Sequence, residues 1–320
     1  MNFKPIIIVA GEPNSIFIEI LLKSLKLNKY KSPIILICSH NLLKLQMKKL
    51  NSKCEIKLLD FDNFKKTDLE KKKINLLNVN YKTTKAFEKI TKKSKVYIDK
   101  CFDVALRLLK LNISNKLING PVSKKYFLEN KYLGITEYLA DKTDTKKFAM
   151  LIYNKKLSVS PLTTHLPLKL VSRKINKKLI IEKISLIYDF YKNKIGLIPN
   201  VAVLGLNPHC ESIDKYNEDE KIIQPSVKYL IKNGYKIAGP YPADTIFLKK
   251  NRKKFDVIIG MYHDQVLTPI KTLFEYDAIN ITLGLPFIRV SPDHGPNEKM
   301  LGKNLSNPQS LINSLKFLDK

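Results

Sequence analysis

The chain has 320 residues, of which 44% are hydrophobic and 27% are charged. These proportions are typical of a globular protein and exclude intrinsic disorder, collagen or a coiled coil for the bulk of the chain. No apolar run approaches the roughly 18 residues of a membrane span, and the apolar start ends at Gly11-Glu12-Pro13, too early for a secretory signal. We expect a cytoplasmic protein with no membrane contact.

The net charge is +28, from 57 Lys and Arg against 29 Asp and Glu. Such a charge raises the hypothesis of a basic nucleic-acid-binding protein, which is an alternative of a different class. However, only four of the basic residues are arginine, the side chain that nucleic-acid sites favour, and the lysines are spread along the chain. Lys, Ile and Asn are abundant together and share A/T-rich codons. An amino-acid composition shifted by an A/T-rich genome therefore explains the positive charge better than nucleic-acid binding does. We expect no nucleic-acid partner.

Short β-branched runs bounded by Gly, Pro or Asn predict strands. In chain order they are Ile6–Ala10, Ile34–Cys38, Leu117–Asn119, Ala149–Tyr153, Ser158–Pro161, Val201–Leu206, Val257–Gly260 and Ala278–Leu283. Helical spacing predicts helices around Ile98–Leu109 and Ile180–Tyr191 and a closing helix over Pro308–Leu318, whereas Lys65–Lys73 is typical of a solvated polar segment. Strands that alternate with helices predict an α/β protein with a mainly parallel sheet.

Three of the five histidines have the same position relative to a predicted strand. His165 follows the run Leu157–Leu162, His209 follows Val201–Leu206, and His263 follows Val257–Gly260. Ligands bind beyond the carboxyl ends of strands in open α/β sheets. Three imidazoles at that edge suit a divalent metal with positions left open for substrate, although any one of them alone could be an ordinary polar loop residue.

Two aspartates and three further polar residues complete the candidate site. Asp264, next to His263, and Asp244 could accept a proton from a metal-bound hydroxyl, with a helix cap as the alternative role of Asp244. Lys271, Asn280 and Arg289 suggest capture of a phosphate or carboxylate, with a plain surface position as the alternative for the two basic residues. The sequence contains neither GxGxxG nor a Walker A loop, so a nucleotide would bind without those motifs.

At these residues the chain resembles the 4-hydroxythreonine-4-phosphate dehydrogenase family over nearly its whole length. The motifs that carry the resemblance are Gly11-Glu12-Pro13, Asn119-Gly120-Pro121-Val122, Gly134-x-Thr136-Glu137, Thr164-His165-Leu166-Pro167-Leu168, Gly205-Leu206-Asn207-Pro208-His209, Gly239-Pro240-x-Pro242-Ala243-Asp244-Thr245, Met261-Tyr262-His263-Asp264-Gln265, and Asn280 through Arg289. The last block and the three His motifs are highly specific in combination.

The resemblance implies a two-lobed α/β/α sandwich similar to the isocitrate and isopropylmalate dehydrogenases. Residues 1–130 with 290–320 would form one lobe, and residues 131–289 the other. It also implies a homodimer with a shared active site, in which one divalent ion (zinc, cobalt or magnesium) is held by three histidines from both subunits. These match His165, His209 and His263, and the catalytic carboxylates match Asp244 and Asp264.

The implied reaction belongs to vitamin B6 biosynthesis. It is the NAD- or NADP-dependent oxidation of 4-phosphohydroxy-L-threonine at C3, to a β-keto acid that decarboxylates to 3-amino-2-oxopropyl phosphate. The family's substrate-binding positions match Ile135, Thr136, Lys271, Asn280 and Arg289. The stretch from Asp293 through His294 and Gly295 is similar to the cofactor-contact turn of the wider superfamily.

One substrate position departs from the family pattern. The family has His where this chain has Ile135, and an isoleucine side chain cannot donate a hydrogen bond. The loss of a charge-assisted contact would cost about 1.5–3 kcal/mol. A sister dehydrogenase that acts on another four-carbon phosphorylated hydroxy acid, threonate or erythronate phosphate, therefore stays open as an alternative.

Overall fold

The structure, a computed structural model, describes residues 3–129, 131–213, 216–292 and 294–319. The chain divides into two compact units, each of which is described by itself. Unit 1 comprises Met1–Ile135 and Pro286–Lys320, and unit 2 comprises Thr136–Leu285. Asp293 begins the stretch that is similar to a cofactor-contact turn, and it lies outside the described residues.

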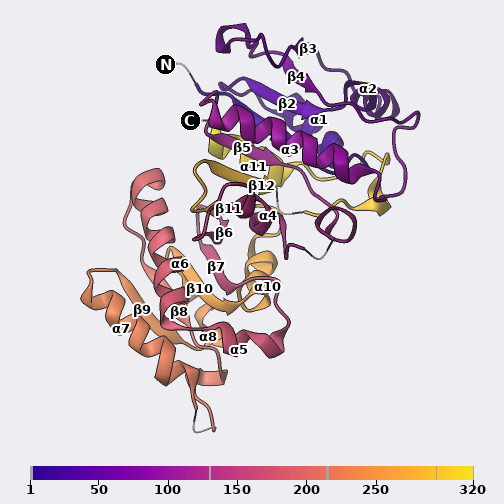
Figure 1. Cartoon of the computed structure of the whole chain (residues 1–320). Coiled ribbons are helices and arrows are strands. Elements are labelled where there is room, and N and C mark those ends of the chain that lie inside the picture. The colour runs from indigo at the N-terminus through magenta and orange to yellow at the C-terminus, as the bar shows by residue number, and fades with distance from the viewer. Residues whose placement is uncertain (1–2, 130, 214–215, 293, 320) are drawn as a thin grey trace. The chain divides into compact units, whose positions relative to one another are not determined.

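Unit 1 is built on a parallel sheet with the strand order β3-β4-β2-β1-β5-β12 (Figure 1). The strands are β1 (Ile6–Val9), β2 (Ile34–Cys38), β3 (Ile56–Leu59), β4 (Ile74–Asn78), β5 (Lys116–Asn119) and β12 (Ile288–Pro292). The helices are α1 (Phe17–Leu27), α2 (His40–Lys49), α3 (Ser94–Lys110) and α11 (Gln309–Leu318). All residues of β1 and β2 are buried, as expected for central strands covered on both faces.

Unit 2 has the strand order β11-β6-β7-β10-β8-β9. Its strands are β6 (Ala149–Tyr153), β7 (Ser158–Thr163), β8 (Val201–Leu204), β9 (Ile237–Tyr241), β10 (Val257–Tyr262) and β11 (Ile279–Leu283). The pairs of β6 with β11 and β7 are antiparallel, and the pairs from β7 to β9 are parallel. The helices are α4 (Ile135–Lys142), α5 (Val171–Lys174), α6 (Lys177–Phe190), α7 (Gln224–Lys232), α8 (Ala243–Ile246), α9 (Lys249–Arg252) and α10 (His263–Phe274).

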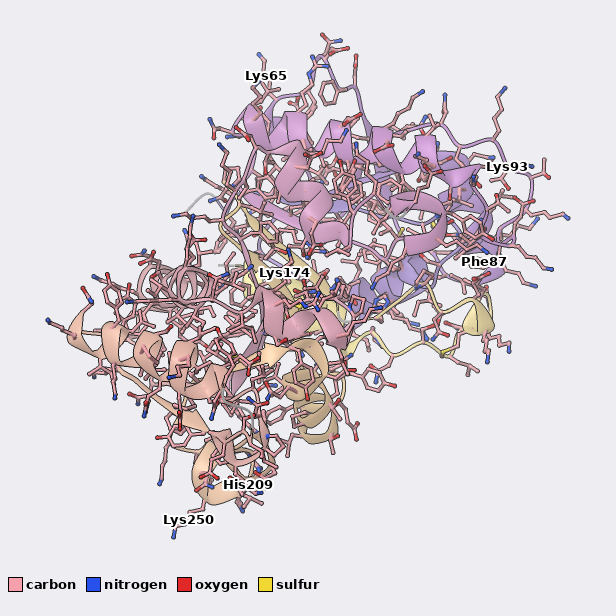
Figure 2. The ribbon with its side chains drawn as sticks, turned by 60° about the horizontal axis from the view of Figure 1, so that its bottom comes forward. Lys65, Phe87, Lys93, Lys174, His209 and Lys250 are labelled. Carbon is pink, nitrogen blue, oxygen red and sulfur yellow. The ribbon has the colours of Figure 1, made fainter. Side chains whose placement is uncertain are left out.

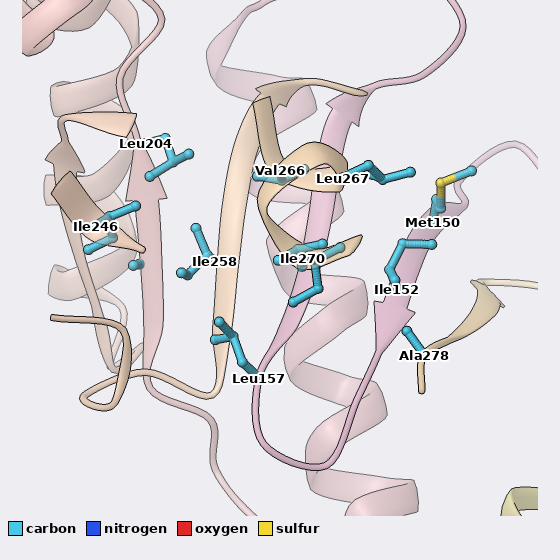
Figure 3. Close-up of a cluster of buried hydrophobic side chains, with 12 residues drawn as sticks. Met150, Ile152, Leu157, Leu204, Ile246, Ile258, Val266, Leu267, Ile270 and Ala278 are labelled. Atoms are coloured by element: carbon cyan, nitrogen blue, oxygen red, sulfur yellow. The ribbon is translucent and has the colours of Figure 1, made fainter. Parts of the chain in front are cut away.

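A buried cluster in unit 2 fixes helix α10 against the sheet (Figure 3). Val266, Leu267 and Ile270 project from one face of α10 and belong to the same cluster as Ile152 of β6 and Ile258 of β10. Each is at most 5% exposed, so each contributes about 1.5–3 kcal/mol of hydrophobic stabilisation. This packing matters for function because α10 begins at His263.

The eight predicted strands are confirmed, with ends within two residues of the predicted ones. The helices predicted around Ile98–Leu109, around Ile180–Tyr191 and at the C-terminus are confirmed as α3, α6 and α11. Every residue of Lys65–Lys73 is at least partly exposed, as predicted. Strands β3, β4, β9 and β12 were not predicted. Among the described helices, none combines the length and apolar character that a membrane crossing requires.

Candidate active site

The register of two parallel strands brings His165 and His263 together. Thr163 at the end of β7 pairs with Tyr262 at the end of β10, and the Thr163 hydroxyl donates to the Met261 carbonyl at 2.7 Å. The two histidines follow these strand ends, and their ring centroids are 5.6 Å apart with a 38° tilt. The strand-end pattern thus places two imidazoles side by side at the carboxyl edge of the sheet.

The backbone at His165 is held in an unusual conformation. Its φ of +47° lies in the left-handed region, which costs a non-glycine residue about 1–3 kcal/mol unless the surroundings enforce it. The preceding residue is anchored to α4, because the Thr164 hydroxyl donates to Oε1 of Glu137 at 3.2 Å. Glu137 is therefore part of the support for His165, a role that no local sequence pattern indicates.

Asp264 fixes the orientation of the His263 ring. Its Oδ1 lies 2.6 Å from Nδ1 of His263, and the carboxylate occupies the first turn of α10, where a negative charge is favourable. With the proton on Nδ1 donated to this carboxylate, Nε2 keeps its lone pair and is the atom available to a metal. The Asp264 side chain is 80% exposed, so a substrate could also reach it.

His209 lies apart from this pair, in an exposed loop after β8 at the margin of unit 2 (Figure 2). Its φ is +56°, and Cys210 follows with a φ of +64°. Burial raises the pKa of the Cys210 thiol to about 11, with smaller contributions from the charges of Asp219 and Asp244. Asp244, an exposed residue of α8, therefore lies near the loop that carries His209.

The histidines fit a metal only in part within one chain. In the described ranges, no group of three or more His, Cys, Asp or Glu residues could hold a metal ion. One chain supplies His165 and His263 as a neighbouring pair and presents His209 separately. Catalytic zinc sites use about three protein ligands, so this pair alone supplies fewer donors than such a site needs.

Two of the expected substrate residues lie along one face of β11. The hydroxyls of Thr136, on α4, and Thr282, on β11, are 3.3 Å apart. Asn280 precedes Thr282 by two residues and therefore points to the same side of the strand. Within the described part of the chain, the buried Oδ1 of Asn280 accepts no hydrogen bond, which leaves it available to a ligand.

The expected basic residues have contrasting environments. Lys271 is exposed and lies in the last turn of α10, the helix that begins at His263. Arg289 lies on β12 in unit 1 and is 1% exposed, so a surface position for it is excluded. Its Nε donates to Oδ1 of Asn119, on β5, at 2.7 Å. Asn119 thus orients the buried guanidinium.

The remaining expected residues are accessible. Ile135, the first residue of α4, is half-buried. His294 and Gly295 belong to unit 1, and Nδ1 of His294 lies 3.0 Å from the Gly295 carbonyl oxygen. Gly295 has no atom within 4 Å of where a Cβ would stand. The turn therefore has room for a ligand.

The sequence profile described as "Pyridoxal phosphate biosynthetic protein PdxA" matches residues 29–318. The chain belongs to the PdxA family. A relative from Sulfurihydrogenibium, named 4-hydroxythreonine-4-phosphate dehydrogenase, is 39% identical over 97% of this chain and 96% of its own length. A crystal structure of 4-hydroxythreonine-4-phosphate dehydrogenase from Klebsiella pneumoniae has a TM-score of 0.83, at 27% identity, and covers 98% of each chain.

The PdxA family also includes relatives with another named substrate. A D-threonate 4-phosphate dehydrogenase from Pectobacterium atrosepticum is 32% identical over 68% of this chain and 68% of its own length. Exposed lysines occur in both units of this PdxA family member; Figure 2 labels Lys65 and Lys93 in unit 1 and Lys174 and Lys250 in unit 2. This distribution does not favour the nucleic-acid-binding alternative.

Proposed function

We propose that this protein is a 4-hydroxythreonine-4-phosphate dehydrogenase that oxidises 4-phosphohydroxy-L-threonine at C3 with NAD or NADP. The observation that carries the proposal is the pair of imidazoles of His165 and His263 at the carboxyl edge of the sheet, in a chain of the PdxA family. The product is a β-keto acid with an adjacent amine, which loses carbon dioxide to give 3-amino-2-oxopropyl phosphate.

His165 and His263 would hold the divalent ion, and His209 of a second copy would complete its coordination in a homodimer with a shared site. The ion, when bound, lowers the pKa of a substrate hydroxyl. Imidazole ligands suit zinc or cobalt better than magnesium, although availability also decides which metal is bound. Two observations support the shared site: among the described residues His165 and His263 form a pair without a third His, Cys, Asp or Glu grouped for a metal, and His209 is exposed.

The side chains around the pair have separate tasks. Asp264 keeps the His263 ring oriented, and Asp244 or Asp264 would accept the proton of the C3 hydroxyl. A bound nicotinamide cofactor would supply the hydride acceptor. Thr136 and Asn280 hydrogen-bond the substrate, while Lys271 and Arg289 bind its phosphate. Binding energy from the phosphate then orients the reacting carbon. His294 and Gly295 are the proposed cofactor contacts.

Steady-state kinetics with authentic 4-phosphohydroxy-L-threonine test the proposal. We expect formation of NADH or NADPH that stops after chelation and returns when zinc or cobalt is added. No activity with this substrate under metal-replete conditions would overturn it. Size measurement in solution tests the homodimer.

The second candidate is a dehydrogenase of D-threonate or erythronate 4-phosphate. Ile135 favours it, because this position offers no hydrogen bond, and a relative is named for D-threonate 4-phosphate. The same assay with the amine-free acids separates the two candidates. If turnover of an amine-free acid equals or exceeds that of the amino acid, the second candidate replaces the first.

A further inference from the structure

The loop that carries His209 is fixed by one buried carboxylate. Asp219 is 1% exposed. Its Oδ1 accepts a hydrogen bond from the Leu206 amide at 2.7 Å, and its Oδ2 accepts from the amide and the side-chain Nδ2 of Asn207, at 3.0 and 2.9 Å. Three hydrogen bonds to the Asp219 carboxylate therefore hold the two residues that precede Pro208 and His209, and Nδ2 of Asn207 also donates to Oε2 of Glu218 at 3.2 Å.

Asp219 is itself held in place. Its amide donates to Oδ1 of Asn217 at 2.9 Å, and it begins the helical turn Asp219–Ile223 that continues into α7. At Gly205, a Cβ would lie 2.6 Å from Oδ1 of Asp219 and 2.7 Å from Sγ of Cys210. The loop therefore packs tightly against the Asp219 carboxylate. A small movement of Asp219 would displace the loop.

The same loop is tied to β10, the strand that precedes His263. Nε2 of Gln265 donates to the Gly205 carbonyl at 2.8 Å, while its Oε1 accepts from the Met261 amide at 2.7 Å. Met261 belongs to β10, and Gln265 lies two residues after His263 on α10. Asp219 and Gln265 therefore hold neighbouring residues at the start of the same loop, and Gln265 also contacts the strand that precedes His263.

We propose that Asp219 is a positioning residue that holds His209 in its left-handed backbone conformation and so aims its imidazole at the metal; this inference rests on the proposed function. His209 and Cys210 have consecutive positive φ values, which need enforcement from their surroundings. A carboxylate is suited to this because it only accepts hydrogen bonds and binds amide N–H groups strongly.

The test compares Asp219→Asn with a matched control in the full chain. In Asp219→Asn, an NH₂ group replaces one carboxylate oxygen. A hydrogen-bond donor then faces N–H groups that were bound by an acceptor. In the control, Asp256→Asn, the same substitution is made at the opposite end of β8, where Oδ2 of Asp256 accepts one bond from the Asn200 amide at 2.8 Å and an asparagine oxygen can replace it. His209→Ala marks the effect of losing the ligand itself.

Two readouts are used: calorimetric titration of the metal-free protein with Co²⁺, and alkylation of Cys210 by iodoacetamide, located by mass spectrometry. We expect Asp219→Asn to weaken Co²⁺ binding about 10–100-fold, the usual effect of removing a residue that supports a metal ligand. Cys210 should be alkylated several-fold faster in the same variant without metal. Asp256→Asn should match wild type in both measurements.

The outcomes separate this inference from the proposed function. Wild-type Co²⁺ affinity in Asp219→Asn, together with weak binding in His209→Ala, overturns the inference alone. Wild-type affinity in His209→Ala overturns both. An equal loss in Asp256→Asn shows general loosening and also overturns the inference. If Asp219→Asn does not fold, Asn207→Ala keeps the backbone bonds to Asp219 and removes the bonds from the Asn207 side chain to Asp219 and Glu218. Unchanged Co²⁺ affinity in that variant contradicts the proposal.

Discussion

Oδ1 of Asp264 lies 2.6 Å from Nδ1 of its neighbour His263, so the carboxylate orients the imidazole ring. The contact occurs between adjacent residues at the first turn of α10, which the buried face of the helix holds against the sheet. Asp264 can therefore have two roles, which the next experiment separates: support of the imidazole, and acceptance of a substrate proton.

Asp264→Ala removes the acceptor of the His263 proton, and we expect Co²⁺ affinity to fall about 10–100-fold. Asp264→Asn keeps an oxygen that can accept this hydrogen bond, so its metal affinity should stay within a few-fold of wild type. If Asp264 also accepts the substrate proton, kcat of Asp264→Asn should still fall by about 10²–10⁴-fold. Equal metal affinities in the Ala variant and wild type would contradict the supporting role.

Chelation of the protein should abolish NADH formation and leave the fold intact. The cluster that fixes α10 consists of apolar side chains, so folding does not depend on the histidines. Activity should return on addition of zinc or cobalt. Far-ultraviolet circular dichroism before and after chelation checks the fold, and a cooperative loss of helix signal on chelation would contradict this prediction.

Thr282→Val removes the hydroxyl that lies 3.3 Å from Oγ1 of Thr136, with almost no change in side-chain shape. The loss of a neutral hydrogen bond of about 0.5–1.5 kcal/mol should raise KM for the phosphorylated substrate by roughly 2–10-fold, with kcat nearly unchanged. Thr272→Val is the control, since Thr272 is exposed and its hydroxyl donates within α10 to the Thr268 carbonyl. A fall in kcat at constant KM would exclude a role of the Thr282 hydroxyl in substrate binding.

Ile135→His should lower KM for 4-phosphohydroxy-L-threonine if that is the natural substrate. The new charge-assisted contact is worth about 1.5–3 kcal/mol, so the expected change is at least tenfold. Ile135→Leu, which adds no donor, is the control. If Ile135→His instead lowers activity with D-threonate 4-phosphate and gains none with the amino acid, Ile135 is a specificity residue for the amine-free substrate.

Glu12 in unit 1 predicts a pH-dependent stability. Burial raises the pKa of Glu12 above 4.5, although Ser94 and the Asn14 amide donate to the carboxylate and oppose the change. The folded state then binds the proton more strongly than the unfolded chain. The stabilisation is present in full below 4.5 and is lost as pH rises through the folded pKa.

Relative to Glu12→Gln, wild type should therefore become more stable as pH falls from neutral toward 4.5. Each pH unit between the two pKa values is worth about 1.4 kcal/mol. Urea unfolding of both proteins at a series of pH values provides the measurement. A stability difference that is constant with pH would rule out the elevated pKa.

The strands were predictable where the chain supplied β-branched runs between turn residues. β9 was not, because Gly239 and Pro240 lie inside it and are typical of turns; here its only described partner is β8, which makes it an edge strand that tolerates proline. β4 includes the fully buried Asn75, whose Nδ2 donates to the Ile34 and Glu70 carbonyls. A buried polar residue such as Asn75, whose hydrogen bonds are made with other segments, interrupts the apolar run by which a buried strand is predicted.

The candidate site also contains some features that were predictable from the sequence and others that were not. The adjacency of His165 and His263 was predictable, since parallel strands end at one edge and each histidine follows a strand. The supporting contacts were not predictable, because they join residues far apart in the chain. Asn119 meets Arg289 across 170 positions, and Asp219 lies in a polar stretch that resembles any surface loop.

The pairing of Thr163 with Tyr262 has a consequence for how such enzymes diverge. Two imidazoles that are placed by backbone register are inherited with the sheet, whereas the residue at position 135 belongs to a helix that can vary independently. A change of preferred substrate from an amino acid to a sugar acid therefore needs only substitutions at positions such as 135, and these leave the paired strand ends in place.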